Sequence, residues 1–426
     1  MLTSLARRNG VNRVVLALSV ARLGDAIGNS ILFIVIPLYV AHLPAPWFPW
    51  PEPVRVGVLI ALYGLVNSAL QPFLGALSDR WGRRKPLIIG GLLVMALSTF
   101  LFVFAERFTS LLLLRALQGV GVALTIPASL ALMATATTRE TRGGSMGVYS
   151  AMRMLGFAIG PLIGGLLYDQ VGFNVAFVVG TISILIGMLM VQVWVTEPPR
   201  PVDKSTTATH RRGRRLFDRD LLTIGLLGAA FASFVMSVDF SMLSALETQV
   251  NDRLNETALG FGIAFSALIV SRLIFQIPLG RLSDRIGRKP LIVAGLILIA
   301  PATALLGVVV TTLQLTWLRI FQGIASAAIA APAFALGADL AKAGGEGLQM
   351  SIITMGFGLG IAGGPLMAGV LAVWSYELPF MMAGVLSLIS AWLVFRYVPE
   401  TINRHAVRAT VRSDEASSAR YGDHAD

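Results

Sequence analysis

Seven charged side chains interrupt long apolar stretches of this sequence: Arg22, Asp25, Arg115, Arg153, Asp239, Arg272 and Arg319. A charge at the centre of a lipid bilayer costs at least about 2.5–3.5 kcal/mol, so residues of this kind point to function. Arg22, Asp25 and Asn29 stand at helical spacing and share one face of a helix. Because Asp25 lies near the middle of its apolar stretch, we expect this face to line a cavity rather than to contact lipid.

Asp25 is the residue that we predict to carry a proton. A carboxylate held away from water can bind and release a proton, and a cation that comes close competes with that proton. One carboxylate is therefore enough to couple proton movement to the binding of a cationic molecule. The alternative is a structural ion pair of Asp25 with Arg22 or Arg115. Asp239 ranks second as a proton carrier, and it either pairs with Arg272 or lies in an outer vestibule.

The composition indicates an integral membrane protein. Of the 426 residues, 55% are hydrophobic and 13% are charged, and the mean hydropathy is +0.74, whereas a soluble chain carries about 25% charged residues. A membrane-spanning helix needs about 20 residues, and twelve apolar runs of that length lie near 13–40, 56–77, 87–105, 109–134, 146–168, 174–195, 221–246, 258–281, 290–309, 313–338, 349–371 and 378–397. None alternates as a β-barrel strand does, so the expected fold class is all-α.

The basic residues predict the orientation in the membrane. The chain carries 34 Lys+Arg against 23 Asp+Glu, a net charge of +11. The basic residues gather near the N-terminus and at Arg80–Lys85, Arg139–Arg142 and Arg281–Lys289, whereas the opposite loops carry few. Since cytoplasmic loops carry the excess of basic residues, we expect both termini in the cytoplasm. We expect the membrane to be a bacterial inner membrane. Membrane orientation accounts for the excess of positive charge, so we do not expect the protein to bind nucleic acid. Glu247 is expected in an outer loop.

Several kinds of chemistry lack the residues that they need. The chain has no Cys, which excludes disulfides, thiol catalysis and thiolate metal sites. Its four His are expected in loops or tails, and no Walker loop for ATP occurs. Paired carboxylates of the kind that a membrane enzyme would need are absent as well. We therefore expect no enzyme, no cofactor and no metal.

The two halves of the chain are copies of each other. The segment GALSDRWGRRKP at Gly75 recurs as GRLSDRIGRKP at Gly280, LRALQG at Leu114 recurs as LRIFQG at Leu318, and Gly160-Pro161 recurs as Gly364-Pro365. Each half begins and ends on the same side, so the copies are parallel. The predicted domains are a six-helix bundle at 1–195, a flexible cytoplasmic linker at 196–220, a second bundle at 221–398 and a disordered tail at 399–426.

At these motifs the sequence resembles the major facilitator superfamily of secondary transporters, over essentially the whole chain. The loop motif G-x-L-x-D-R-x-G-R-(R)-K-P, present in both halves, is typical of that superfamily. The pattern G-x-x-x-G-P-x-x-G-G is similar to that of the twelve-helix drug:proton antiporters, and it is made by Gly156, Gly160, Pro161, Gly164 and Gly165. Its near copy around Gly364 shows that the pattern can also serve helix packing. The resemblance implies that Arg115 tunes the protonation of the carboxylate on the first helix.

The resemblance also implies a conformational latch at the loop motif. Its residues would be Gly75, Asp79, Arg80, Arg83 and Asp284. Asp79 would face the N-terminus of the eleventh helix, where a negative charge is worth about 0.3–1 kcal/mol. The glycine motif of the fifth helix would give smooth contact surfaces to helices that slide, and Pro161 would fix a kink.

These features predict a proton-coupled exporter that acts as a monomer on small amphipathic or drug-like molecules by alternating access. The expected cavity residues are Arg22, Asn29, Arg272, Phe33, Tyr63 and Phe234. The alternatives are an exporter of one dedicated solute, such as a sugar, a lipid precursor or a siderophore, a facilitative uniporter, and a receptor that transports nothing. Because intramembrane Arg outnumber Asp, an anionic or zwitterionic substrate near Arg22, Arg115 or Arg272 also remains open.

Overall fold

The computed structural model describes residues 12–45, 47, 49–138, 141–196, 223–340 and 346–401, apart from the side chains of 79, 346–349 and 351. Within that part, every element is helical, and twelve helices are long and apolar enough to cross a membrane, as the sequence predicted. The proposed linker and tail fall almost wholly outside the described residues, as does the side chain of Asp79.

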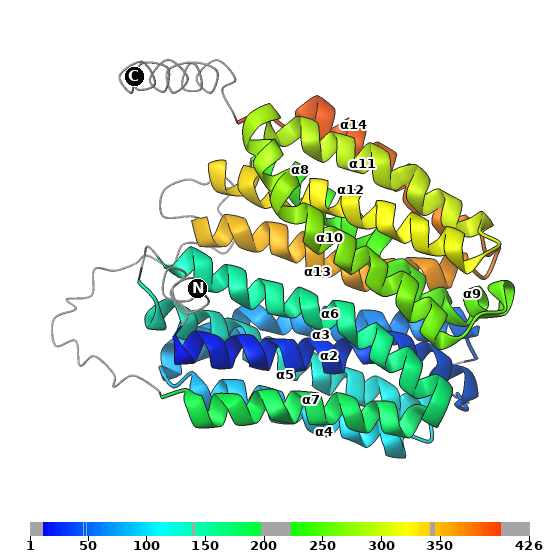
Figure 1. Ribbon diagram of the computed structural model, residues 1–426, viewed down its shortest axis with the longest axis horizontal. Helices are drawn as coiled ribbons and strands as arrows, with labels where there is room; N and C mark the ends of the chain where they lie inside the picture. Colours follow the sequence, from blue (N-terminus) through cyan, green and yellow to red (C-terminus); the bar gives the residue numbers. More distant parts are fainter. Residues whose placement is uncertain are drawn as a thin grey trace, which may run out of the picture.

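The first six spans form one bundle, in the lower part of Figure 1. They are α2 (Arg13–His42), α3 (Glu52–Trp81), α4 (Lys85–Leu101) with the short η1 (Phe102–Phe104), α5 (Phe108–Ala136), α6 (Arg142–Val171) and α7 (Phe173–Trp194). Helix α3 extends through the loop motif as far as Trp81. It stops there because Gly82 adopts a left-handed conformation, with φ of 68°, and donates its N–H to Ser78 O at 3.1 Å.

The second bundle repeats this order. Its elements are α8 (Ile224–Ser241), η3 (Met242–Leu246), α9 (Glu247–Leu254), α10 (Ala258–Ile286), α11 (Arg288–Ala304), η4 (Leu305–Val308), α12 (Thr312–Asp339), α13 (Glu346–Leu371) and α14 (Leu378–Tyr397). The segment after α8 departs from the prediction, because the helical span continues through η3 and α9 as far as Leu254. Glu247 is consequently buried, with none of its surface exposed, and the expectation of an outer loop is wrong.

Four helices form the interface between the bundles (Figure 1). Helix α3 packs on α13, and α6 packs on α10, whereas α4 and α7 lie on the outer side of the first bundle and α11 and α14 on that of the second. We call the end where α3 meets α4 and α10 meets α11 the motif end, and the opposite end of the molecule the far end. Helix α2 packs between α6 and α7 inside the first bundle and makes smaller contacts with η3, α9 and α10 of the second.

The interface is tight at the far end. A Cβ atom on Gly165 would lie 2.5 Å from the backbone oxygen of Ala258, and one on Gly262 would lie 2.5 Å from that of Pro161. On the other pair of helices, a Cβ atom on Gly57 would lie 2.4 Å from the backbone oxygen of Pro365. Such spacing leaves no room for side chains, so the two backbones touch at glycine.

The motif end is different. A Cβ atom on Gly143 or Gly147 would meet nothing within 4 Å, and those on Gly75 and Gly280 would meet only residues of their own bundle. Phe73, on the same stretch of α3, is 72% exposed. In the part of the chain that the structure describes, the interface glycines of the two bundles therefore touch at the far end and not at the motif end.

Candidate functional site

The polar face of α2 centres on an ion pair between Arg22 and Asp25. The two residues are one helical turn apart, and both are buried, with 8% and 3% of their surface exposed. Arg22 binds only one carboxylate oxygen, because Oδ1 of Asp25 has no hydrogen-bond partner. The guanidinium carbon of Arg22 also lies 5.8 Å from the centre of the Tyr149 ring on α6. An ion pair of Asp25 with Arg22 was one of the alternatives in the sequence analysis, and the structure contains it.

Asn29 and Tyr63 continue the same polar layer. The Asn29 amide donates to the Tyr63 hydroxyl at 2.5 Å, which joins α2 to α3. Arg115 of α5 packs on the ring of Tyr63, and its guanidinium carbon lies 5.5 Å from the ring centre. No ion pair joins Arg115 to Asp25 among the described residues. The effect of Arg115 on Asp25 would have to pass through Tyr63 or through space.

Arg115 belongs to a buried chain of hydrogen bonds inside the first bundle. It donates to Gln118 at 3.1 Å, and Gln118 donates to Thr99 on α4 at 2.8 Å. The second bundle holds a copy, in which Arg319 donates to Gln322 at 2.9 Å and Gln322 donates to Thr303 at 2.8 Å. The sequence repeat is therefore also a repeat of side-chain bonding, and its presence in both bundles indicates a role in holding helices together.

Asp239 does not occupy the position that the sequence suggested. It is fully buried inside the second bundle, where its carboxylate accepts a hydrogen bond from Ser387 on α14 at 2.8 Å. The expected pair with Arg272 does not form among the described residues, and Asp239 does not lie in an outer vestibule. The reason is that Asp239 faces α14, away from the interface on which Arg272 lies.

Two arginines meet across the interface at Phe357. The guanidinium carbon of Arg153 on α6 lies 5.8 Å from the centre of the Phe357 ring on α13, and that of Arg272 on α10 lies 5.9 Å from it. Arg153 also lies 5.5 Å from the ring centre of Phe157. The sequence placed both arginines in the membrane but gave no sign that they share a ring, because that contact joins three helices.

The aromatic residues predicted for the cavity have different surroundings. Phe33 is 2% exposed and packs between Phe157 of its own bundle, at 6.0 Å between ring centres, and Phe265 of the other, at 6.1 Å. It thus lies in a closed cluster toward the far end. Phe234 is half-buried and stacks on Phe231 at 6.0 Å. Of these rings, Tyr63 is the one in contact with the polar layer.

The glycine motif of α6 brings this helix against α2. A Cβ atom on Gly156 would lie 2.5 Å from that of Ala26, and one on Gly160 would collide with the Ser30 hydroxyl. Ser30 donates to the backbone oxygen of Gly156 at 3.1 Å. Gly164 likewise packs on α2, where an added Cβ would lie 3.1 Å from Ile31 O, whereas Gly165 and Pro161 contact α10. One motif therefore provides both helix packing within the bundle and contact between the bundles.

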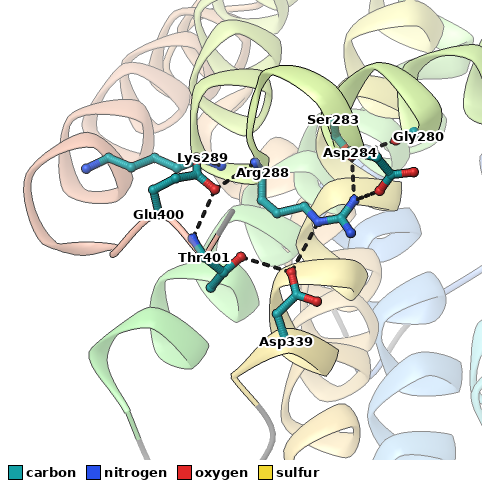
Figure 2. Close-up of polar contacts among 8 residues, drawn as sticks. All are labelled: Gly280, Ser283, Asp284, Arg288, Lys289, Asp339, Glu400 and Thr401. Atoms are coloured by element: carbon teal, nitrogen blue, oxygen red, sulfur yellow. Dashed lines mark hydrogen bonds and ion pairs between the residues drawn. The ribbon is translucent and has the colours of Figure 1, made fainter. Parts of the chain in front are cut away.

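The motif end of the second bundle carries a network of charged groups (Figure 2). Arg288 forms an ion pair with Asp284 and a second one with Asp339, whose Oδ2 lies 3.2 Å from its Nε. Glu400 accepts from the backbone N–H groups of Arg288 and Lys289, at 3.0 Å and 3.1 Å, and so caps α11. All of these contacts lie within one bundle, as Figure 2 shows.

The other predicted latch residues lie at the same end. Arg80 and Arg83 are exposed, and Gly75 lies beside Pro127 of its own bundle, 3.5 Å from where its Cβ would be. Asp79 ends α3, but its side chain lies outside the described residues. Asp284 is engaged within its own bundle by Arg288. The latch between the bundles therefore stays a prediction.

The sequence missed two acidic residues at the far end. Asp169 of α6 accepts from the backbone N–H groups of Ala258 and Leu259, at 3.2 Å and 2.9 Å, and so caps α10 of the other bundle. Glu247 lies near Asp169, and neither of its carboxylate oxygens has a hydrogen-bond partner. The apolar continuation Met242–Leu246 was the available signal for Glu247, since it extends the buried segment toward that residue.

Comparison with known proteins gives matches over the whole fold. The family model described as Major Facilitator Superfamily matches residues 18–246 and 229–419. The synaptic vesicular amine transporter of Bos taurus is 26% identical over 364 residues, which are 81% of this chain and 66% of that protein. The chain thus spans about two thirds of the length of that relative. The multidrug resistance protein MdtG of Citrobacter koseri is 28% identical over 274 residues, 64% of this chain and 67% of that protein.

Two kinds of solved structure have the same fold. A bacterial homologue of the human lysosomal transporter Spinster, inward-facing and unoccupied, has a TM-score of 0.73 at 17% identity and covers 90% of this chain and 95% of its own. A mutant of the nucleoside transporter NupG has a TM-score of 0.74 at 13% identity and covers 91% of this chain and 100% of its own. The relatives and the proteins with the same fold are named as transporters, not as enzymes. The twelve membrane-spanning helices and a family model that matches nearly the whole length show that this chain belongs to the Major Facilitator Superfamily.

Proposed function

We propose that this protein is a proton-coupled exporter of small amphipathic or drug-like molecules. It would act as a monomer in the bacterial inner membrane, with both termini in the cytoplasm. Two relatives support this substrate class, because one is named a multidrug resistance protein and the other an amine transporter. The predicted domains, with bundles at 1–195 and 221–398 joined by a linker at 196–220 and followed by a tail at 399–426, are part of the proposal.

The observation that carries the proposal is the Arg22–Asp25 pair on α2. The pair is buried, and one oxygen of Asp25 has no partner. A buried carboxylate that keeps one oxygen free can accept either a proton or the ammonium group of a substrate, but not both at once. Mutual exclusion of proton and substrate at one site is the condition for antiport. Arg22 would hold the carboxylate in place in both states.

The unequal ends of the interface support alternating access. Contact at the far end and separation at the motif end correspond to a protein open on the side of the basic loops, which the positive-inside rule assigns to the cytoplasm. Rocking of the two bundles would then close the motif end and open the far end. In that second state Asp79, Arg80 and Arg83 would form the latch.

The remaining predicted residues fit supporting roles in this scheme. Arg115 would act on Asp25 through Tyr63, which lies between Arg115 and Asn29. Asp239 would be structural rather than proton-carrying, because it faces α14 and not the interface. Gly156, Gly160 and Gly164 would let α6 move closely along α2.

Efflux of ethidium from energised cells tests the proposal, with and without a protonophore. Wild-type protein should lower the cellular ethidium signal, and the protonophore should abolish this effect. Asp25→Asn should remove the protonophore-sensitive efflux, whereas Asp239→Asn, made to equal expression, should retain it. Efflux that survives in Asp25→Asn would move the proton to another group. Absence of ethidium efflux in wild type would favour a dedicated solute, and efflux insensitive to the protonophore would favour a uniporter.

A further inference from the structure

Arg153, Arg272 and Phe357 form a cluster between the bundles that the proton-carrying role of Asp25 does not use. The three residues come from α6, α10 and α13, so the cluster exists only when the two bundles come together. Both guanidinium carbons lie within 6 Å of the Phe357 ring centre, at 5.8 Å and 5.9 Å. The two arginines are also close enough to repel each other electrostatically.

The charges of this cluster are not balanced. Neither Arg153 nor Arg272 forms an ion pair within the described part of the chain. Asp25 lies near Arg153, because Gly156, one turn further along α6, packs directly on α2. The carboxylate of Asp25 is, however, bound by Arg22. This carboxylate is thus already engaged by one arginine, and Arg153 and Arg272 have no acidic partner of their own in the described part of the chain. Nε of Arg272 is buried and has no hydrogen-bond partner.

Burying a cation without a partner costs free energy, and this free energy falls when an anion supplies both an opposite charge and hydrogen bonds. Guanidinium groups bind carboxylate and phosphate through two parallel hydrogen bonds, so these are the anions that fit. The Phe357 ring, which lies close to both arginines, offers an apolar surface beside the charges. A ligand with an acid group on an apolar body would satisfy all three residues.

The position of Asp25 restricts this ligand further. Its free oxygen is available to an ammonium group, and it lies within electrostatic range of Arg153. A purely anionic ligand would bind best when Asp25 is protonated, which would move anion and proton in the same direction. A ligand with an amine and an acid group at one end instead places the amine at Asp25, where it competes with the proton.

We infer that the substrate is an amphipathic zwitterion, whose amine binds Asp25 and whose acid group binds Arg153 and Arg272. This inference rests on the proposed function and names its substrate class. Since Arg153 and Arg272 belong to different bundles, the acid group would also link the bundles at the level of the polar layer. Binding of the substrate would thus act directly on the equilibrium between the two conformations.

Three probes with one apolar body test the inference. They are Nε-dansyl-lysine, which has the amine and the acid, its methyl ester, which keeps only the amine, and its Nα-acetyl derivative, which keeps only the acid. Binding to the purified protein in detergent is read from dansyl fluorescence. The wild-type protein should bind the zwitterion about tenfold more tightly than either derivative, because each buried charged group that loses its partner weakens binding by about that factor.

Variants separate a binding role from a structural one. Arg153→Gln and Arg272→Gln should each reduce the preference for the zwitterion over the ester to about onefold to twofold, while binding of the ester stays the same or tightens. Arg285→Gln, an exposed position further along α10, is the control and should retain the full preference. Equal weakening of zwitterion and ester, or a wild-type protein that prefers the ester, would overturn the inference.

Transport of the same probes distinguishes this inference from the proposed function. In proteoliposomes with a pH gradient, the wild-type protein should move the zwitterion fastest. Movement of the ester alone, at equal rates in Arg272→Gln, would overturn the inference and leave proton-coupled transport intact. If no probe moves but the zwitterion binds in an Arg272-dependent manner, the proposed function fails and the site stands.

A phospholipid with an amine and a phosphate offers the same chemistry as a dissolved zwitterion. Dansyl-lysine binding is therefore compared in nanodiscs of phosphatidylcholine, whose headgroup has no free amine, and of phosphatidylethanolamine. Weaker binding in phosphatidylethanolamine would assign the site to a lipid headgroup, and equal binding would assign it to a soluble amphiphile. Either result upholds the zwitterion site, and loss of binding in both lipids would overturn it.

Discussion

The two ends of the interface between the bundles differ in the kind of contact that they make. At the far end, backbones meet directly at glycines such as Gly165 and Gly262, and the Asp169 carboxylate caps a helix of the opposite bundle. At the motif end, long charged side chains are held inside one bundle, as in the network of Arg288 with Asp284 and Asp339. Close backbone packing is rigid and depends on shape, whereas exposed ion pairs are weak and can exchange partners.

This difference indicates what each end would have to change in the proposed alternation between two conformations. In the proposed cycle, the far end would have to lose a well-fitted contact in order to open, and the motif end would have to regroup partly exposed charges. The Arg22–Asp25 pair lies between the ends, with Phe33 and Phe265 closing the path on the far side. In the proposed cycle, a change in the protonation of Asp25 would shift the balance between two states whose contacts differ in kind.

The largest effect on this balance should come from Gly165→Ala. The added Cβ would lie 2.5 Å from Ala258 O, and such overpacking costs about 1–3 kcal/mol. The closed far end should therefore lose about tenfold or more in population. Spin labels on Leu166→Cys and Ile263→Cys, two exposed positions of a chain without native Cys, would report a longer distance between α6 and α10.

Gly147→Ala is the matched control on the same helix. Nothing lies within 4 Å of its added Cβ, so the distance distribution should stay that of the wild type. An equal shift in both variants would show that the interface is not tighter at the far end than at the motif end.

A smaller shift is expected from Asp169→Asn. A negative charge at a helix N-terminus is worth about 0.3–1 kcal/mol at an exposed site, so removing it should open the far end by about twofold to fivefold. The same spin labels measure this change. Asp252→Asn, an exposed acid of α9, should leave the distance unchanged. A wild-type distance in Asp169→Asn would mean that the cap on α10 does not hold the bundles together.

The smallest effect is expected from Glu377→Gln. Arg253 donates to Glu377 at 2.9 Å and holds the pKa of its carboxyl below the usual range, but both side chains are more than a third exposed to solvent and belong to one bundle. Because the folded pKa is the lower one, this contact stabilises the protein above the unfolded pKa and is lost as the pH falls through the lowered value. Thermal unfolding of variant and wild type should differ slightly at pH 7 and converge in acid. A change in the far-end distance would contradict a role confined to one bundle.

The twelve helices could be predicted because a bilayer demands an apolar run of about 20 residues for each span. The polar face of α2 could be predicted for a similar reason, since Arg22, Asp25 and Asn29 repeat at the helical period. Both inferences use only neighbours in sequence. The structure confirms the spans and brings Arg22 and Asp25 together on that face.

Contacts between distant segments could not be predicted in this way. Asp239 binds Ser387 of α14, and no periodicity along α8 reveals which neighbour an inward residue meets. Glu247 is buried because the helical span continues from α8 through η3 into α9, although the polar sequence that follows Leu246 resembles a loop. Arg153 and Arg272 meet at Phe357 only through the association of two bundles.

The most direct test of proton coupling at Asp25 compares two modes of transport in proteoliposomes. Purified wild-type protein should accumulate a fluorescent amine against its gradient when a pH gradient is imposed, and should also exchange labelled for unlabelled amine without one. Asp25→Asn should lose the accumulation by about 100-fold or more, because it no longer binds a proton, yet keep the exchange, because the bundles still rock. Accumulation that persists in Asp25→Asn and disappears in Asp239→Asn would contradict the assignment of the proton to α2.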